Sequence, residues 1–232
     1  MRAPSSSLFA LRHYFTAVAR LGAAGADFEA MRRCGIAAEA AMLRATGGIN
    51  THRGAVFSLG LLVAAAAACR SRLGHAATGE QVCLEVRRWA ADFARAPLDA
   101  GSPGQRARAL HKVPGVREQA AAGYPLLREV ALPVLRDALA NGLAREAAMC
   151  HTLMQLVAHT DDLNLLHRGG TEGLRWAQQQ ARRFLAEGGA FAHDWRPRLH
   201  VIADAFVARH LSPGGSADLL ACSLFLLQQE RT

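Results

Sequence analysis

A long apolar segment, residues 55–69, is the feature that most restricts how this chain can fold. It directly follows a polar stretch punctuated by glycine, residues 47–54. A helix that is apolar on every side is usually buried, so the segment predicts a helix at the centre of the core. It is too short and too rich in alanine to be taken as a membrane span, and we expect no membrane contact.

The polar stretch before this helix has the residues that bind an anion. First-turn N–H groups of a helix lack intrahelical partners and carry the positive end of the helix dipole. Glycine lets a phosphate approach such a backbone closely, and arginine can hold it with two hydrogen bonds. A plain capped core helix explains the stretch equally well. The candidate phosphate-binding residues are Gly48, Asn50, Thr51 and Arg53, with His52 as a further donor or a catalytic acid.

Composition and periodicity predict an all-α fold. Hydrophobic residues are 51% of the 232 residues and aromatic residues only 6%, so the apolar mass is alanine and leucine, which favour helix. No segment alternates as a strand would. We expect a single compact multi-helix domain, residues 1–232. The residues of its second helix that are expected to face the core are Phe28, Met31, Ile36, Ala40 and Leu43. The expected helices cover about residues 7–21, 27–45, 55–74, 78–94, 124–140, 143–160, 190–210 and 219–227, with another through Trp176 and Leu185.

The charge balance narrows the class of partner. Lys and Arg number 27 against 19 Asp and Glu, which gives a net charge of +8. Such an excess is compatible with phosphorylated ligands, nucleic acid or an anionic membrane. The basic residues are dispersed singly and in pairs, which fits a solvated surface plus one anion pocket better than a nucleic-acid-binding arm.

Cysteine usage predicts a reducing compartment. The five cysteines are odd in number and have no metal-knuckle spacing, so we expect free thiols and a cytoplasmic protein. Residues 1–26 contain arginine but no acid, which leaves an organellar transit peptide as a lesser alternative.

Residues 97–123 differ in character from the rest of the chain. They are rich in proline and glycine, and a connection of this length inside a domain is uncommon and often functional. A mobile lid over a substrate and an ordinary surface loop explain the segment about equally well. Its candidate phosphate-binding residue is Arg117.

Two further polar clusters, around residues 164 and 215, place glycine beside charged residues at helix ends. Carboxylate and amide oxygens suit Mg²⁺, which is commonly held by one or two carboxylates plus substrate phosphates. The clusters therefore predict a metal–polyphosphate site, and ordinary helix caps and surface ion pairs are the alternative. Asp161 and Asn164 are three residues apart and are expected to share a helix face. The candidates are Asp161, Asp162 and His167 for catalysis, Asp162, Asp218 and Glu39 for the metal, and Asn164, Arg168, Gly169, Gly214, Gly215 and Ser216 for phosphate.

Four stretches of the chain, in the same order, resemble motifs of the triphosphoribosyl-dephospho-CoA synthases. Residues 47–60 read Gly-Gly-Ile-Asn-Thr-His-Arg-Gly-Ala-Val-Phe-Ser-Leu-Gly, and residues 117–125 are similar to the family's Arg-Gly-Glu-Ala…Gly-Phe-Pro stretch. Residues 162–170 read Asp-Leu-Asn-Leu-Leu-His-Arg-Gly-Gly, and residues 211–220 read Leu-Ser-Pro-Gly-Gly-Ser-Ala-Asp-Leu-Leu. The sequence of residues 162–170 resembles that of the malonate decarboxylase branch more than that of the citrate lyase branch.

The resemblance implies an activity. The family transfers the 5-triphosphoribosyl group of ATP to the 2′-hydroxyl of 3′-dephospho-CoA and releases adenine. The product is the precursor of the prosthetic group of an acyl-carrier subunit. Residue chemistry then assigns roles: Arg53, Arg168 and the backbone of residues 214–215 hold the triphosphate, and Asp161 or Asp162 binds Mg²⁺ or acts as a base. His52 or His167 protonates adenine or holds a phosphate.

The chain departs from the family pattern at two places. Leu163 stands where the family usually has a small hydroxyl residue, so a hydrogen bond near Asp162 is expected to be missing. The family's upstream Lys-Pro-Gly-Leu-Val-Asp and Gly-Ala-His stretches do not occur here. A nucleotide-binding or assembly protein with impaired catalysis is therefore the first alternative, and a nucleic-acid-binding protein the second. A homo-oligomer stays open.

Overall fold

The computed structural model describes residues 5–46, 53–96 and 103–231. These residues form helices and contain no strand, so the all-α prediction is confirmed for the described part of the chain. The chain divides into two compact units, residues 1–95 with 120–124 and 224–232, and residues 96–119 with 125–223. Each unit is described by itself, and the expectation of one domain stays a prediction.

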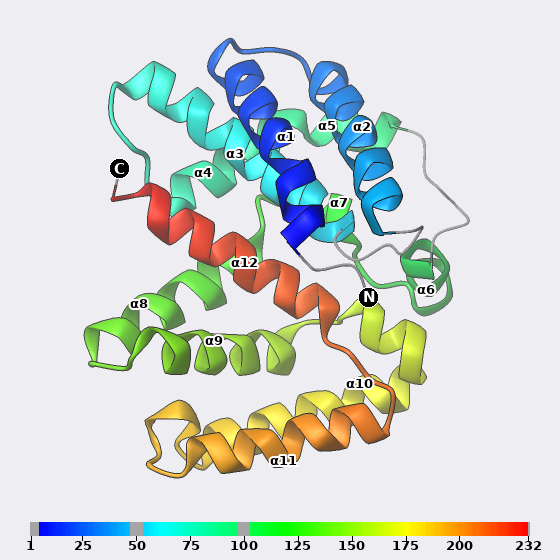
Figure 1. Cartoon of the computed structure of the whole chain (residues 1–232), viewed down its shortest axis with the longest axis vertical. Helices are drawn as coiled ribbons and strands as arrows, with labels where there is room; N and C mark the ends of the chain where they lie inside the picture. Colours follow the sequence, from blue (N-terminus) through cyan, green and yellow to red (C-terminus); the bar gives the residue numbers. More distant parts are fainter. Residues whose placement is uncertain (1–4, 47–52, 97–102, 232) are drawn as a thin grey trace. The chain divides into compact units, whose positions relative to one another are not determined.

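The first unit is built around the apolar helix that the sequence predicts. Helices α1 (Ser5–Ala23) and α2 (Phe28–Thr46) pack against each other and against α3 (Arg53–Leu73), which also contacts α4 (Gly79–Glu85) (Figure 1). The η1 turn (Val86–Trp89) and α5 (Ala90–Arg95) follow. Leu62, Ala64 and Ala65 of α3 are fully buried. A Cβ on Gly22 of α1 would lie 2.1 Å from the Ala64 carbonyl oxygen, so α1 and α3 cross backbone to backbone.

Helix α3 also meets the length and composition that a membrane crossing needs. Its residues Gly54–Leu73 have a mean hydropathy of 1.6, and half of that window is buried in the structure. The core helix of a soluble protein passes the same test. The hydropathy of α3 therefore agrees with its position as the central helix of the first unit.

Local signals set the helix ends of the first unit. Asp27 accepts the N–H of Ala30 at 2.8 Å, and Thr78 forms a capping box with Gln81, as their positions before helical runs predict. The expected helix over 78–94 is interrupted by the η1 turn. Two predicted core residues of α2 are wrong: Ile36 is 52% exposed and Leu43 is 38% exposed.

The second unit is a set of paired helices. The π-helix η2 (Leu127–Ala131) continues into α8 (Leu132–Ala140). Helix α8 packs on α9 (Arg145–His159). The long α10 (Leu163–Ala186) contacts α9 and lies beside α11 (Trp195–Ala208), with the η3 turn (Gly189–Phe191) between the two (Figure 1). Their shared core includes Leu165, Phe184 and Phe206. The helix runs on through Pro133, because Ala131 and Leu132 both have right-handed helical dihedrals and the proline lies in the first turn of α8.

Two boundaries in the second unit differ from prediction. The described part of residues 97–123 holds two helices, α6 (Pro103–His111) and α7 (Val116–Ala121), rather than irregular loop alone. Its mobility stays a prediction. The last helix, α12 (Gly214–Gln229), begins five residues before the expected start. The glycines and Asp218 thus lie within its first turns, where the structure gives them packing partners that sequence periodicity does not show.

Candidate functional site

A buried carboxylate joins the starts of two helices in the second unit. Asp162 is the N-cap of α10, and its Oδ1 accepts the backbone N–H of Asn164 at 2.9 Å and of Leu165 at 3.4 Å. Its Oδ2 accepts the backbone N–H of Ser216 at 2.8 Å and the Ser216 hydroxyl at 3.0 Å. Asp162 is 1% exposed and Ser216 is fully buried. We call this meeting of the α10 and α12 N-termini at Asp162 the α10–α12 junction.

The two glycines at the start of α12 make this close approach possible. A Cβ on Gly215 would lie 3.1 Å from Asp162 Oδ1, and one on Gly214 would lie 2.5 Å from the amide nitrogen of the Asn164 side chain. From the sequence, Gly214 and Gly215 are predicted to bind phosphate. In the structure they already have a second reason to lack a side chain, which is the packing of α12 against the first turn of α10.

Asp218 lies on the same side of α12 as these glycines. Residues three and four apart share a helix face, so Asp218 follows Gly215 and Gly214 by one turn toward α10. Burial and the neighbouring Asp162 carboxylate raise the pKa of Asp218 to about 7. Asp218 is only half-buried, whereas Asp162 is closed off from solvent. Asp218 is therefore the carboxylate of the junction that a bound molecule can reach.

The motif stretches 162–170 and 211–220 also meet along the helix beyond the junction. A Cβ on Gly169 would lie 2.5 Å from Leu211 Cδ2, so this glycine admits the side chain that precedes α12. Arg168 donates through Nη1 to the His210 carbonyl at 3.4 Å. Gly170 interrupts the helix with φ 61° and ψ −162°. Residues 162–170 and 211–218 thus form one continuous structure, which supports their common assignment to a site.

The exposed candidates lie around the same helix start. Asp161, His167 and Arg168 are all exposed. The prediction that Asp161 and Asn164 share a helix face is wrong, because α10 begins at Leu163 and Asp161 precedes its N-cap. Asp161 is therefore a side chain of the link between α9 and α10. His167 and Arg168 are exposed hydrogen-bonding side chains of α10, about one turn after its start.

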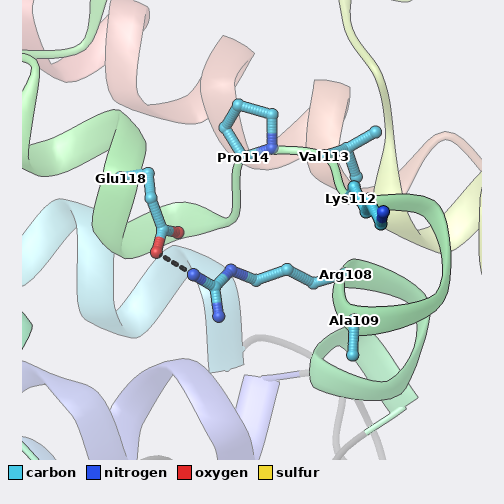
Figure 2. Close-up of a pocket in the computed structure, with 6 residues that line it drawn as sticks. All are labelled: Arg108, Ala109, Lys112, Val113, Pro114 and Glu118. Carbon is cyan, nitrogen blue, oxygen red and sulfur yellow. Dashed lines mark hydrogen bonds and ion pairs between the residues drawn. The ribbon is translucent and has the colours of Figure 1, made fainter.

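Arg117 has a structural partner. Its Nη1 donates to the Ala96 carbonyl at 2.6 Å. The next residue, Glu118, accepts the Gly115 N–H at 2.9 Å and pairs with Arg108 (Figure 2). The Arg108–Glu118 pair, together with Lys112, lines a cavity of about 440 Å³ at the turn between α6 and α7. Lys112 has a positive φ of 55°, for which the sequence gives no local signal.

Glu39 belongs to the first unit, whereas the junction belongs to the second. It is half-buried on α2 and acts electrostatically on Tyr14, whose hydroxyl donates to the Val56 carbonyl at 3.1 Å. Burial, with Cys34 and Glu39 nearby, raises the pKa of Tyr14 above its ordinary range. The structure thus places Glu39 in the helix packing of α1 to α3.

Most of the first motif lies outside the described residues. Gly48, Asn50, Thr51 and His52 belong to the range 47–52, and only the backbone of Arg53 is described, as the first residue of α3. Their predicted contacts with phosphate stay predictions.

Only one carboxylate of the junction has oxygens free for a cation. Asp162 and Asp218 are neighbouring carboxyl groups, and neither forms a salt bridge within the described part of the chain. Both Asp162 oxygens are occupied by N–H and O–H donors, so Asp218 is the oxygen donor left to a cation. Within the described ranges no three His, Cys, Asp or Glu side chains gather as a closed metal site. One carboxylate plus substrate phosphates is the usual way in which Mg²⁺ is held.

One buried polar atom beside the junction was missed by the sequence. Thr160 is 8% exposed and its hydroxyl has no hydrogen-bond partner within the described structure. Its carbonyl accepts from the Gln178 side chain at 3.2 Å, which ties the end of α9 to α10. A threonine at a helix end is a common cap, so nothing in the pattern distinguishes it as an unsatisfied group.

Comparison with known proteins decides the family. The model of the ATP:dephospho-CoA triphosphoribosyl transferases matches residues 5–232. The chain belongs to this family. The resemblance of its four motifs to triphosphoribosyl-dephospho-CoA synthases is therefore confirmed at the level of the whole chain.

Individual relatives agree. A 2-(5″-triphosphoribosyl)-3′-dephosphocoenzyme-A synthase of Klebsiella pneumoniae is 39% identical over 84% of this chain and 66% of its own length. A protein of Acinetobacter calcoaceticus that carries the same name as a probable assignment is 35% identical over 97% of this chain and 77% of its own length. The chain thus spans about two thirds to three quarters of these curated relatives.

A solved structure shares the fold. The crystal structure of an Archaeoglobus fulgidus protein assigned as a triphosphoribosyl-dephospho-CoA synthase superposes with a TM-score of 0.61 at 14% identity. The match covers 96% of this chain and 98% of that one. At this identity the likeness shows the fold alone.

Proposed function

We propose that this chain transfers the 5-triphosphoribosyl group of ATP to the 2′-hydroxyl of 3′-dephospho-CoA and releases adenine. The observation that carries the proposal is the family match across residues 5–232, together with relatives named for this product. The junction supports it, because two of the four motif stretches meet there in space.

The reaction exchanges one bond to ribose for another. The bond from the ribose anomeric carbon to the adenine nitrogen breaks, and adenine leaves with the electron pair. A bond forms from the same carbon to the 2′-oxygen of dephospho-CoA. The proton lost by the 2′-hydroxyl balances the proton gained by adenine. A site for this chemistry must hold the triphosphate, polarise the hydroxyl and protonate the leaving base.

The residues of this chain suggest how those tasks divide. Asp218 is the carboxylate that would direct Mg²⁺ onto the triphosphate, and the cation would neutralise phosphate charge there. Exposed Arg168 is a donor for phosphate oxygens, and His167 is placed one residue away as a proton donor or a further phosphate contact. Asp161 is a candidate base. Asp162 has a structural role, because its hydrogen bonds hold the α10–α12 junction together.

The wider setting follows from the same family relationship. The product would be passed on toward an acyl-carrier subunit, and the wording of residues 162–170 favours the malonate decarboxylase branch. The five cysteines are free, which supports a reducing compartment such as the cytoplasm.

Adenine release tests the proposal. The purified chain is mixed with ATP, Mg²⁺ and 3′-dephospho-CoA, and adenine and the heavier CoA adduct are followed by mass spectrometry. The proposal expects both products in equal amounts. ATP binding without either product, in this chain and in a version extended upstream, would favour a nucleotide-binding protein without the activity.

A further inference from the structure

The carboxylate of Asp162 has no acceptor capacity left for a ligand. Each of its oxygens accepts two hydrogen bonds, two from α10 and two from Ser216. A carboxylate offers about four acceptor positions in all. The side chain is also 1% exposed. A metal ion or a substrate hydroxyl would have to displace one of these donors and open the junction.

The four hydrogen bonds nevertheless fix something that a ligand can reach. The Ser216 backbone N–H and hydroxyl bind the first turn of α12 to the first turn of α10. Gly215 packs directly on the carboxylate, so the turn has little freedom to shift. Asp218 stands one turn further on the same face and is half-buried rather than closed off.

We propose that Asp162 is a positioning residue: through Ser216 it holds the first turn of α12 so that the Asp218 carboxylate faces the bound substrates. This inference rests on the proposed function for its kinetic consequence but not for its structural one. The residue type of Asp162 suggests a metal ligand or a base. In this proposal Asp162 instead acts indirectly, through Ser216.

Two substitutions of Asp162 separate the roles. In Asp162→Asn the amide oxygen can still accept from α10 and the amide nitrogen can donate to the Ser216 hydroxyl, so three of the four hydrogen bonds can be kept, whereas the Ser216 backbone N–H faces another donor and loses its acceptor. In Asp162→Ala all four are lost. The proposal expects adenine release to fall about tenfold in the first and at least about a hundredfold in the second, in kcat with KM for ATP unchanged. A base or a metal ligand would be lost equally in both.

Substitution of the partner gives a matched pair. Ser216→Ala removes the hydroxyl donor, and Ser223→Ala removes another buried hydroxyl of α12 that donates only locally, to the Leu220 carbonyl at 2.7 Å. We expect a three- to tenfold loss of kcat in Ser216→Ala and a change within about twofold in Ser223→Ala. This pair keeps the proposal testable if Asp162→Ala does not fold.

Amide hydrogen exchange supplies a readout that needs no turnover. The proposal expects exchange of residues 214–220 to quicken at least tenfold in Asp162→Ala, less in Asp162→Asn, and not at all in Ser223→Ala. A wild-type chain that releases no adenine contradicts the proposed function, whereas unchanged exchange in Asp162→Ala contradicts the positioning role. Asp162→Asn as inactive as Asp162→Ala, with normal exchange, would also overturn it.

Discussion

The carboxylate of Asp162 and the backbone N–H of Ser216 are 2.8 Å apart, although 54 positions separate the two residues in the chain. This contact joins the two motif stretches that carry most of the candidate site. The same carboxylate caps α10, so one side chain sets the start of one helix and the position of another.

The two glycines of α12 should differ in what they tolerate. Gly215→Ala places a methyl group 3.1 Å from a buried carboxylate that four hydrogen bonds hold in place. Gly214→Ala meets the far end of the exposed Asn164 side chain, which can move away. We expect Gly215→Ala to lower the free energy of unfolding by about 1–3 kcal/mol, as overpacking does. Gly214→Ala should cost under about 0.5 kcal/mol. Denaturant titration of both variants measures the difference, and equal costs would contradict the close packing of α12 on Asp162.

The raised pKa of Asp218 predicts a pH-dependent stability. Its value of about 7 in the folded chain lies above the ordinary 3.8, so the folded state favours the neutral acid. Stability from this group is complete below about pH 4 and is lost as pH rises through about 7. Asp218→Asn should therefore match the wild type at pH 4 and exceed it at pH 8. After discounting for partial exposure, the gain should be about 1–2 kcal/mol.

Urea unfolding in the presence of EDTA measures this difference without a cation. Asp204→Asn is the control, because it removes a solvent-exposed carboxylate of α11. A gain for Asp218→Asn that is the same at pH 4 and pH 8 would contradict the raised pKa that burial and the Asp162 carboxylate give Asp218.

Removal of the unpartnered Thr160 hydroxyl should not harm the fold. Thr160→Val keeps the shape of the side chain and deletes a buried oxygen that has no hydrogen-bond partner in the described structure. We expect the free energy of unfolding to stay the same or to rise by up to about 1 kcal/mol. A loss above that size in thermal or denaturant unfolding would mean that the hydroxyl is satisfied in solution.

The crossing of α1 and α3 should be intolerant of a single methyl group. Gly22→Ala would place a Cβ 2.1 Å from the Ala64 carbonyl oxygen, where backbone must move. We expect a loss of about 3 kcal/mol or more, or no folded protein. Gly35→Ala is the matched control, because its Cβ would meet only the Tyr14 hydroxyl at 3.8 Å within a helix. It should be neutral or stabilising by up to about 1 kcal/mol, since alanine favours helix.

The fold was largely predictable because its signals are local. Helical spacing, the cap at Asp27 and the capping box at Thr78 each depend on neighbouring residues, and the structure has all three. Ile36 was misplaced because alanine-rich helices offer several faces of similar polarity, and the packing partner decides which one is buried.

The sequence predicted which residues belong to the candidate site but not what each of them does. Motif resemblance selected Asp162, Ser216 and Asp218, but residue type alone suggested that Asp162 binds metal or takes a proton. Its role depends on donors 54 positions away and on Gly215, which no local pattern reveals. Asp161 was misplaced for the opposite reason, because the exact start of α10 decides whether it lies on the helix at all.

The central claim is that this chain makes the triphosphoribosyl adduct of dephospho-CoA, and adenine release tests it most directly. With ATP, Mg²⁺ and 3′-dephospho-CoA, the account predicts free adenine and the CoA adduct in a one-to-one ratio, and neither product when dephospho-CoA is left out. ATP bound but no adenine formed, in this chain and in an upstream-extended one, would contradict it.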